Sequence, residues 1–213
     1  MSFISSPFDF NHLPQRGLVK DTAAASRTWL VSLAEAKEHL RVGHTDDDTY
    51  ITRLTEAAQL VCESLCGTDF TPMTYYLTCD TWEQTLEIPE VSPVRSIDHI
   101  KYYDTATPSV QQTWSAADYY LDSGSQRARI TLVDGAGYPQ LRSGTGNIEV
   151  KFQTKSSWNL VTTTALSAVA VQAILITIAD MYENRQSVIV GRIASSIPKT
   201  AEYLLNTMKI QTL

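Results

Sequence analysis

The residues able to do chemistry in this 213-residue chain are few. Asp180 and Glu183 form the best-placed carboxylate pair, because they lie one turn apart on an expected helix and could serve a hydrolase as acid and base. A catalytic pair also needs a cleft and a raised pKa, which spacing alone does not supply. The same spacing arises where an apolar helix ends and becomes solvated, and we favour that interpretation over a small hydrolase.

Cysteine and histidine spacing offers a second candidate site. Cys62 and Cys66 lie four residues apart on an expected helix and could share a metal with His39 or His44. The sequence contains no second paired-ligand motif, and it contains no phosphate loop or nucleophile elbow. We therefore predict no catalytic residue, no metal and no cofactor. We expect Cys62, Cys66 and Cys79 to be reduced, partly buried thiols.

Composition and charge restrict the class of protein. Apolar residues make up 43% of the chain and charged residues 19%, which is ordinary for a soluble globular protein. The net charge of −6 argues against a protein that grips nucleic acid. Residues 165–179 are apolar all round, but this stretch is shorter than the roughly 20 residues that span a bilayer. It contains Gln172 and Thr177, so we expect a central core helix, no membrane association and, from "MSFISSPFDF", no signal peptide.

Two helices are expected before residue 70. Ser32 and Glu35 have capping-box spacing, and the short helix that they open should end at Gly43. The next helix should begin at the acidic triplet 46–48, whose carboxylates we expect to cap it, and end at Gly67. Its apolar seam follows 3-4-3-4 spacing. The seam comprises Ile51, Leu54, Ala58, Val61 and Leu65.

A period of two replaces the helical period from about residue 71 to 155. In "IEVKFQTK", Ile148, Val150 and Phe152 should face one side of a strand. Five further short apolar runs, separated by Gly- and Pro-containing turns, predict a compact antiparallel sheet or a small barrel. These runs are "MTYYLTC", "QTLEI", "VRSIDHIKYYD", "ADYYLD" and "QRARITLV".

The chain then returns to helix. A long apolar helix is expected from about residue 163 to 184, and Pro198 should start a last short helix. The predicted fold class is α+β: a small bundle of two N-terminal helices, the long apolar helix and the short C-terminal helix, with an inserted antiparallel β-rich module. The expected divisions are an N-terminal arm (1–31), the first helical part (32–70), the inserted module (71–157), the second helical part (158–187) and a C-terminal docking segment (188–213).

These segments, in this order, resemble the head–tail connector (adaptor) family of long-tailed bacteriophages and gene transfer agents. The similarity covers about residues 31–209, and "QTKSSW" stands where members often have a Gly-Tyr turn. The 30-residue leader is longer than the resemblance leads us to expect, and the resemblance says nothing about its role. The similar segments are "SLAEAKEHLRVGHTDDDTYITRLTEAAQLVCESLCG", "SPVRSIDHIKYYD", "DYYLDSG", "ILITIADMYENRQSV" and "IPKTAEYLLNTMK".

The resemblance implies a structural, non-enzymatic virion protein made in the host cytoplasm and placed at the head–tail junction. It would form a ring, twelvefold by the resemblance, under the portal after DNA packaging. The ring would extend the DNA channel without sequence-specific binding and would offer a platform to a stopper or to tail proteins. The alternatives are another neck or tail-terminator ring protein, a small hydrolase and a free-standing carbohydrate-binding module.

Three groups of residues receive roles by this resemblance. The C-terminal segment, which is locally basic, should dock on the portal, and truncation near Gln186 should leave a soluble protein without portal binding. Its docking residues would be Arg192, Lys199, Tyr203, Leu204, Leu205, Met208 and Lys209. The helix end and inter-subunit contact would comprise Tyr182, Glu183, Asn184 and Arg185. Acidic residues would line the channel and repel phosphates; the candidates are Asp46, Asp47, Asp48, Glu56 and Glu63.

Overall fold

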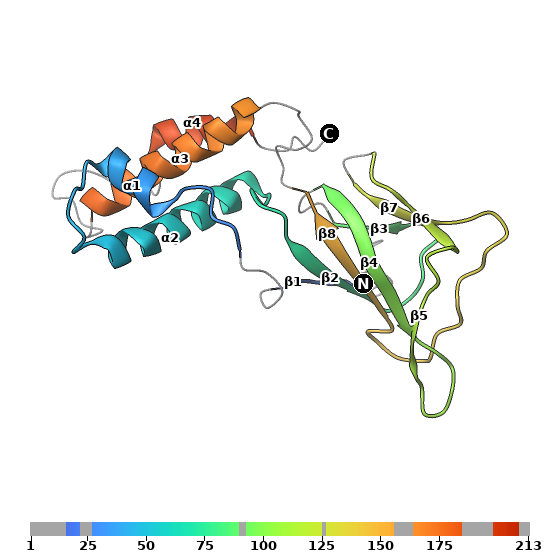
Figure 1. Ribbon diagram of the computed structural model, residues 1–213. Helices are drawn as coiled ribbons and strands as arrows, with labels where there is room; N and C mark the ends of the chain where they lie inside the picture. The colour runs from blue at the N-terminus through green and yellow to red at the C-terminus, as the bar shows by residue number, and fades with distance from the viewer. Residues whose placement is uncertain are drawn as a thin grey trace, which may run out of the picture. The chain divides into compact units, whose positions relative to one another are not determined.

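The computed structural model describes residues 16–21, 27–89, 93–124, 127–155, 164–184 and 198–208. The chain divides into two compact units. The sheet unit comprises Met1–Thr22, Thr74–Glu90 and Val94–Gln153, and the helical unit comprises Ala23–Met73, Val91–Pro93 and Thr154–Leu213. The described residues contain helices and antiparallel sheets, so the predicted α+β class is confirmed (Figure 1).

The helical unit contains every helix of the described residues. They are α1 (Leu33–Leu40), α2 (Asp48–Cys66), α3 (Thr164–Glu183) and α4 (Lys199–Asn206). Among these helices, none combines the length and apolar character that crossing a membrane requires.

The ends of α1 follow one prediction and overturn another. The capping box is confirmed, because the Ser32 hydroxyl accepts from the Glu35 N–H while the Glu35 carboxylate accepts from the Ser32 N–H at 2.8 Å. The prediction that Gly43 ends this helix is wrong, because Arg41 does so in the left-handed conformation, with φ of 57°. The Arg41 N–H bonds to Glu38 and Lys37 carbonyls, so a C-terminal cap forms without glycine.

Helix α2 also begins differently from the prediction. Asp47 is its N-cap residue but makes no side-chain capping hydrogen bond, so the predicted carboxylate cap is wrong at this position. Its Oδ2 instead accepts a 2.6 Å hydrogen bond from the Tyr182 hydroxyl of α3. Gly67 ends α2 with φ of 67°, as predicted.

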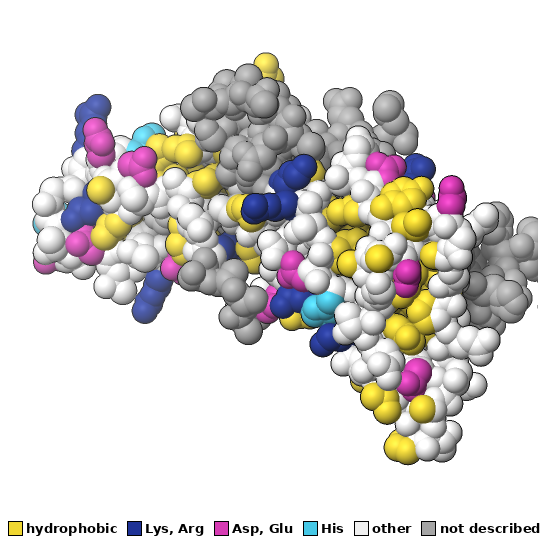
Figure 2. Space-filling view, turned by 45° about the vertical axis from the view of Figure 1, so that its right-hand side comes forward, with side chains coloured by type: hydrophobic (Ala, Val, Ile, Leu, Met, Phe, Trp, Pro, Cys, Tyr) yellow, Lys and Arg dark blue, Asp and Glu magenta, His cyan; other side chains and the backbone are white. Residues whose placement is uncertain are grey.

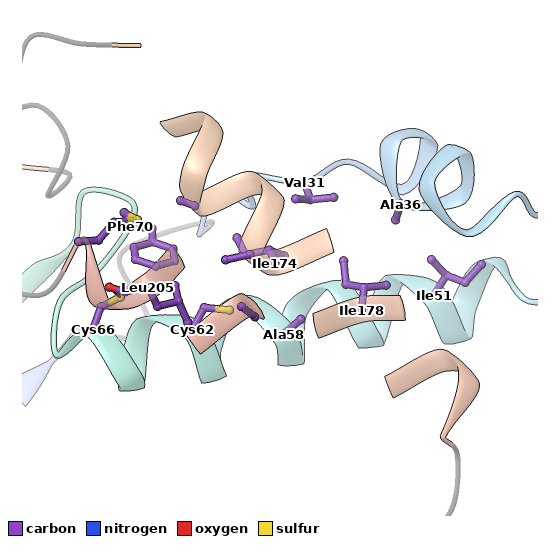
Figure 3. Packing of buried hydrophobic residues seen from close by; sticks show 14 residues of the cluster. Val31, Ala36, Ile51, Ala58, Cys62, Cys66, Phe70, Ile174, Ile178 and Leu205 are labelled. Carbon is purple, nitrogen blue, oxygen red and sulfur yellow. Dashed lines mark hydrogen bonds between the residues drawn. The ribbon is translucent and has the colours of Figure 1, made fainter. Parts of the chain in front are cut away.

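One hydrophobic cluster holds the helical unit together. Figure 3 shows Ile51, Ala58 and Cys62 of α2 turned toward Ile174 and Ile178 of α3. Burying an isoleucine side chain completely contributes about 1.5–3 kcal/mol, so this α2–α3 contact is a major source of stability. The cluster also receives Ala201 and Leu205 from α4 and Met208 from the turn after it.

The seam predicted for α2 is rotated by about one position. Leu54, Val61 and Leu65 are only partly buried at its flanks. Polar side chains occupy buried positions beside Ile51 and Ala58, because hydrogen bonds satisfy them inside the unit. These polar residues are Thr55, Gln59 and Glu63.

The sheet unit contains a five-stranded sheet, in the order β1-β2-β8-β4-β5, and a three-stranded sheet, in the order β3-β7-β6. The strands are β1 (Arg16–Lys20), β2 (Thr74–Cys79), β3 (Leu86–Glu87), β4 (Val94–Tyr103), β5 (Gln111–Thr113), β6 (Tyr119–Asp122), β7 (Arg129–Leu132) and β8 (Ile148–Thr154). The alternation predicted for β8 is confirmed, since Ile148, Val150 and Phe152 are all fully buried.

Two strands were not predicted from the sequence. β1 lies in the expected arm and pairs antiparallel with β2, with Leu18 opposite Leu77. β5 pairs with β4, although all three of its side chains are exposed. Neither sequence, RGLVK or QQT, alternates apolar with polar residues, so tertiary pairing rather than local pattern places these strands in the sheet.

Four aromatic side chains of the sheet unit form a cluster. Trp82 stacks on Tyr138 with ring centroids 5.2 Å apart and lies 4.9 Å from Trp114. Trp114 in turn contacts Tyr119 of β6. Burial raises the pKa of Tyr119, and the pKa of Tyr138 rises through burial and the Glu83 charge. The Trp82 Nε1 and the Tyr138 hydroxyl both donate to backbone carbonyls, so this cluster is partly buried with these polar atoms paired.

Candidate functional site

The carboxylate pair considered for catalysis lies at the end of α3. Asp180 Oδ1 accepts a 2.9 Å hydrogen bond from Asn184 Nδ2, and its carbonyl accepts from the Asn184 N–H. Glu183 is exposed. These contacts close the C-terminal turn of the helix, which is the interpretation that the spacing favoured.

The cysteines are buried thiols that contact helices of their own unit or the sheet core. Cys62 Sγ lies 3.7 Å from Thr177 Oγ1, and Cys66 Sγ donates to the Leu205 carbonyl at 3.6 Å. Burial raises the pKa of the Cys62 thiol, which keeps it in the unreactive protonated form. Within the described ranges, no group of three or more histidine, cysteine or acidic side chains is placed to hold a metal ion.

Tyr182 connects two helix ends of the helical unit. Its hydroxyl donates to Asp47, and its ring lies 6.0 Å from the Tyr50 ring. The next two residues along the chain, Glu183 and Asn184, are exposed. Arg185, the last residue assigned to this contact, lies outside the described residues.

The acidic residues considered for a channel have different environments. Asp46 is exposed over 92% of its side chain. Asp48 accepts a 2.5 Å hydrogen bond from Lys37, and Asp47 accepts from Tyr182 as described. Glu56 is half-buried. These four carboxylates therefore lie at or near the surface of the helical unit.

Glu63 does not fit a channel-lining role. Only 6% of it is exposed, and it forms an ion pair with Arg27. Its Oε1 accepts from Gln59 Nε2 and from the Phe70 N–H, each at 3.0 Å. Glu63 is therefore a buried hub that joins the segment before α1 to the loop after α2. The sequence reasoning missed it because a glutamate in an amphipathic helix is usually solvated.

The residues assigned to portal docking fall into three sets. Leu205 and Met208 are buried within the helical unit, so their side chains are not available to a partner. Leu204 packs against the same cluster and is partly buried. Lys199 and Tyr203 are exposed, and Tyr203 has 73% of its surface accessible. The remaining two, Arg192 and Lys209, lie outside the described residues.

A groove of about 240 Å³ opens between the segment before α1 and the N-terminal half of α2. Most of its lining surface is apolar, and Glu56 is the charged residue of the lining. Thr52 lies one turn before Glu56 along α2. The lining residues are Trp29, Val31, Ser32, Leu33, Thr52, Thr55 and Glu56.

Known structures share this fold over nearly the whole chain. A chain in the structure described as the neck of an empty GTA particle, computed with C6 symmetry, has a TM-score of 0.66 and 22% identity. A chain in the neck of the native GTA particle, computed with C12 symmetry, has a TM-score of 0.64 and 21% identity. A chain in the virion of the native gene transfer agent (GTA) particle has a TM-score of 0.63 and 23% identity.

Each of these comparisons covers 92% of this chain and 97% of the other chain. The likeness therefore includes both units and is not a match of one common module. At this level of identity it shows a shared fold. No protein-family model matches the sequence, and no curated protein matches it.

Proposed function

We propose that this protein is a non-enzymatic structural subunit of the neck of a phage-like particle, where it forms the head–tail connector ring under the portal. The observation that carries the proposal is the near-complete coverage of this chain and of chains from GTA necks by one fold. The ordered sequence segments that resemble connector proteins support the same assignment.

The symmetry of those necks supports a closed ring as the assembly. In a cyclic ring, one patch of each subunit contacts a different patch of the next subunit, and the rotation between neighbours closes the ring. The C12 symmetry of one neck agrees with the twelvefold ring that the resemblance implies. In the proposed particle, the partners are the portal on one side and a stopper or tail protein on the other.

The surface charges support a conduit for DNA. With a net charge of −6, a ring of such subunits repels phosphates more than it holds them. Among the five acidic residues considered, Asp46 is the fully solvated one, so we assign a channel-lining role to Asp46 first. For portal docking, the C-terminal segment remains the proposed region, through Arg192 and Lys209.

Reconstitution with purified portal tests this function. The protein is mixed with portal rings, and the product is examined by sedimentation and negative-stain microscopy. A second ring stacked coaxially on the portal is the expected result. If the protein does not bind portal but binds purified tail tube, it is a tail-terminator instead. Hydrolytic activity that Asp180→Asn abolishes would favour an enzyme.

A further inference from the structure

The groove beside α2 could bind side chains of another protein surface. Its apolar lining includes Trp29 and Leu33, and Glu56 supplies one carboxylate. Glu56 makes no hydrogen bond or ion pair with the part of the chain that the structure describes. A partner that fits would place an apolar or aromatic group against Trp29 and Leu33 and a cation one helical turn away, against Glu56.

Helix α4 carries such a pair on its outer face. Tyr203 is the most exposed of the large hydrophobic side chains described, at 73%. Lys199 lies one turn before it, is also exposed, and forms no ion pair within the described ranges. The inner face of α4 is already fixed by Leu205 in the core. The helix thus presents an exposed tyrosine–lysine pair one turn apart.

We propose that the outer face of α4 docks into the Trp29–Glu56 groove of a neighbouring copy, with Lys199 against Glu56 and Tyr203 against Thr52 and Leu33. This inference rests on the proposed ring function and names its side-to-side contact. Because Lys199 precedes Tyr203 while Glu56 follows Thr52, the two helices run antiparallel across the contact. The Thr52 hydroxyl donates to the Asp48 carbonyl, so its oxygen can still accept from the tyrosine hydroxyl.

Charge and spacing favour a second copy over other occupants. Hydrophobic side chains also gather on the face of the sheet unit seen in Figure 2. The sheet unit as a whole includes Tyr120 among its exposed large hydrophobic residues. Two arginines of that unit, Arg127 and Arg129, already have a carboxylate partner, because a side-chain nitrogen of each lies 3.9 Å from a Glu87 carboxylate oxygen. Lys199 and Glu56 lack such partners within the described ranges. They also lie on different helices of one unit, α2 and α4, and a head-to-tail contact joins two different patches of the subunit.

Charge reversal tests the contact in the full-length protein assembled on portal. Glu56→Lys and Lys199→Glu each place like charges together, so each should raise the protein concentration for half-assembly at least about tenfold. The double variant Glu56→Lys/Lys199→Glu should assemble at the wild-type concentration. An equal mixture of the two single variants should also recover, because each copy's α4 then meets a groove of opposite charge in an alternating ring.

Glu38→Lys is the matched control, since Glu38 is exposed on α1, outside the groove lining, and undergoes the same change of charge. Circular dichroism melting checks that every variant folds. If wild type assembles but neither single variant differs from it, the contact is wrong while the neck function stands. Loss of assembly that neither the double variant nor the mixture restores would place Lys199 or Glu56 against portal and overturn the contact. Wild-type protein that forms no ring, with or without portal, would overturn the proposed function itself.

Discussion

At the scale of single residues, buried polar side chains as well as hydrophobic ones hold the helical unit together. Glu63 accepts from Gln59, Arg27 and the Phe70 N–H, while Gln59 Oε1 accepts from the Leu30 N–H at 2.9 Å. Arg27 also lies over the Trp29 ring, 5.3 Å from its centroid. This network attaches residues 27–30 to α2 and so builds one wall of the groove.

Removing Arg27 should therefore destabilise the helical unit more than a surface substitution does. Arg27→Met leaves the Glu63 carboxylate buried without its cation, which should cost about 3–5 kcal/mol. The double variant Arg27→Met/Glu63→Gln should recover part of this loss because no uncompensated charge remains. Urea unfolding at neutral pH measures both, and Glu38→Gln on the exposed surface of α1 should change stability by less than about 0.5 kcal/mol. An Arg27→Met variant as stable as this control would contradict the buried hub.

The capping box gives a prediction with a defined pH dependence. The hydroxyl of Ser32, and secondly its N–H, lower the pKa of Glu35 by hydrogen bonding to the carboxylate. Because the folded-state pKa is lowered, the stabilisation is present above the ordinary value of 4.5 and is lost as pH falls through the folded-state value. Ser32→Ala should cost about 1 kcal/mol near neutral pH. The difference from wild type in urea midpoint should shrink below pH 4.5, and a constant difference would rule out the carboxylate's part.

At the scale of elements, α4 is a part of the helical core, and this changes one expectation. The sequence alone predicts that truncation near Gln186 leaves a soluble protein that lacks only portal binding. Ala201, Leu205 and Met208 are buried against the other helices, so removing α4 would expose the core. Loss of portal binding after truncation would therefore not separate docking from folding.

Two point substitutions on α4 separate these roles. Leu205→Ala should cost about 3 kcal/mol of unfolding free energy, because Leu205 is 1% exposed and its loss leaves a cavity. Tyr203→Ala, two residues away, should change the stability of the isolated chain by less than about 0.5 kcal/mol but reduce ring formation. Thermal melts and sedimentation velocity measure the two effects. A strong loss of stability in Tyr203→Ala would mean that this face is not free in the subunit.

The elements with strong local signals were predictable from sequence, and those fixed by pairing were not. The capping box at Ser32, the Gly67 stop and the alternation of β8 each depend on neighbours a few residues away. In contrast, β1 becomes a strand because β2, far along the chain, offers it a hydrogen-bonding edge on which Leu18 lies opposite Leu77. The groove likewise requires residues 29–33 to pack on α2, and the buried Arg27–Glu63 ion pair holds this segment there. No local sequence pattern predicts that ion pair.

At the scale of the whole molecule, Asp46 tests the channel role proposed for the acidic residues. Its side chain is 92% exposed, so its replacement should leave folding intact. Asp46→Lys in assembled particles should slow DNA ejection, most at low salt, because a cation in the lumen attracts phosphates. Asp46→Asn should have a smaller effect in the same direction. Ejection rates that stay the same in both variants would remove Asp46 from the channel.

The chain path through the two units gives the last prediction. Apart from the short stretch Val91–Pro93, the chain leaves the helical unit after Met73 and returns at Thr154. These residues are paired, since the Thr154 N–H donates to the Met73 carbonyl at 2.8 Å and the Met73 N–H donates to Thr154 Oγ1 at 3.0 Å. An Asn-Gly turn can therefore join Met73 to Thr154 in place of residues 74–153, at the loss of the Lys155 N–H bond to the Pro93 carbonyl.

A chain that begins at residue 23 and carries this turn should fold as the helical unit alone, because the hydrophobic cluster of that unit contains no residue of the sheet unit. Cooperative urea unfolding together with a helical circular dichroism spectrum would show this, and a non-cooperative transition would contradict it. The shortened chain retains both Glu56 and Lys199. It should therefore still form side-to-side contacts that Glu56→Lys weakens, whereas contacts made through the sheet unit would be lost.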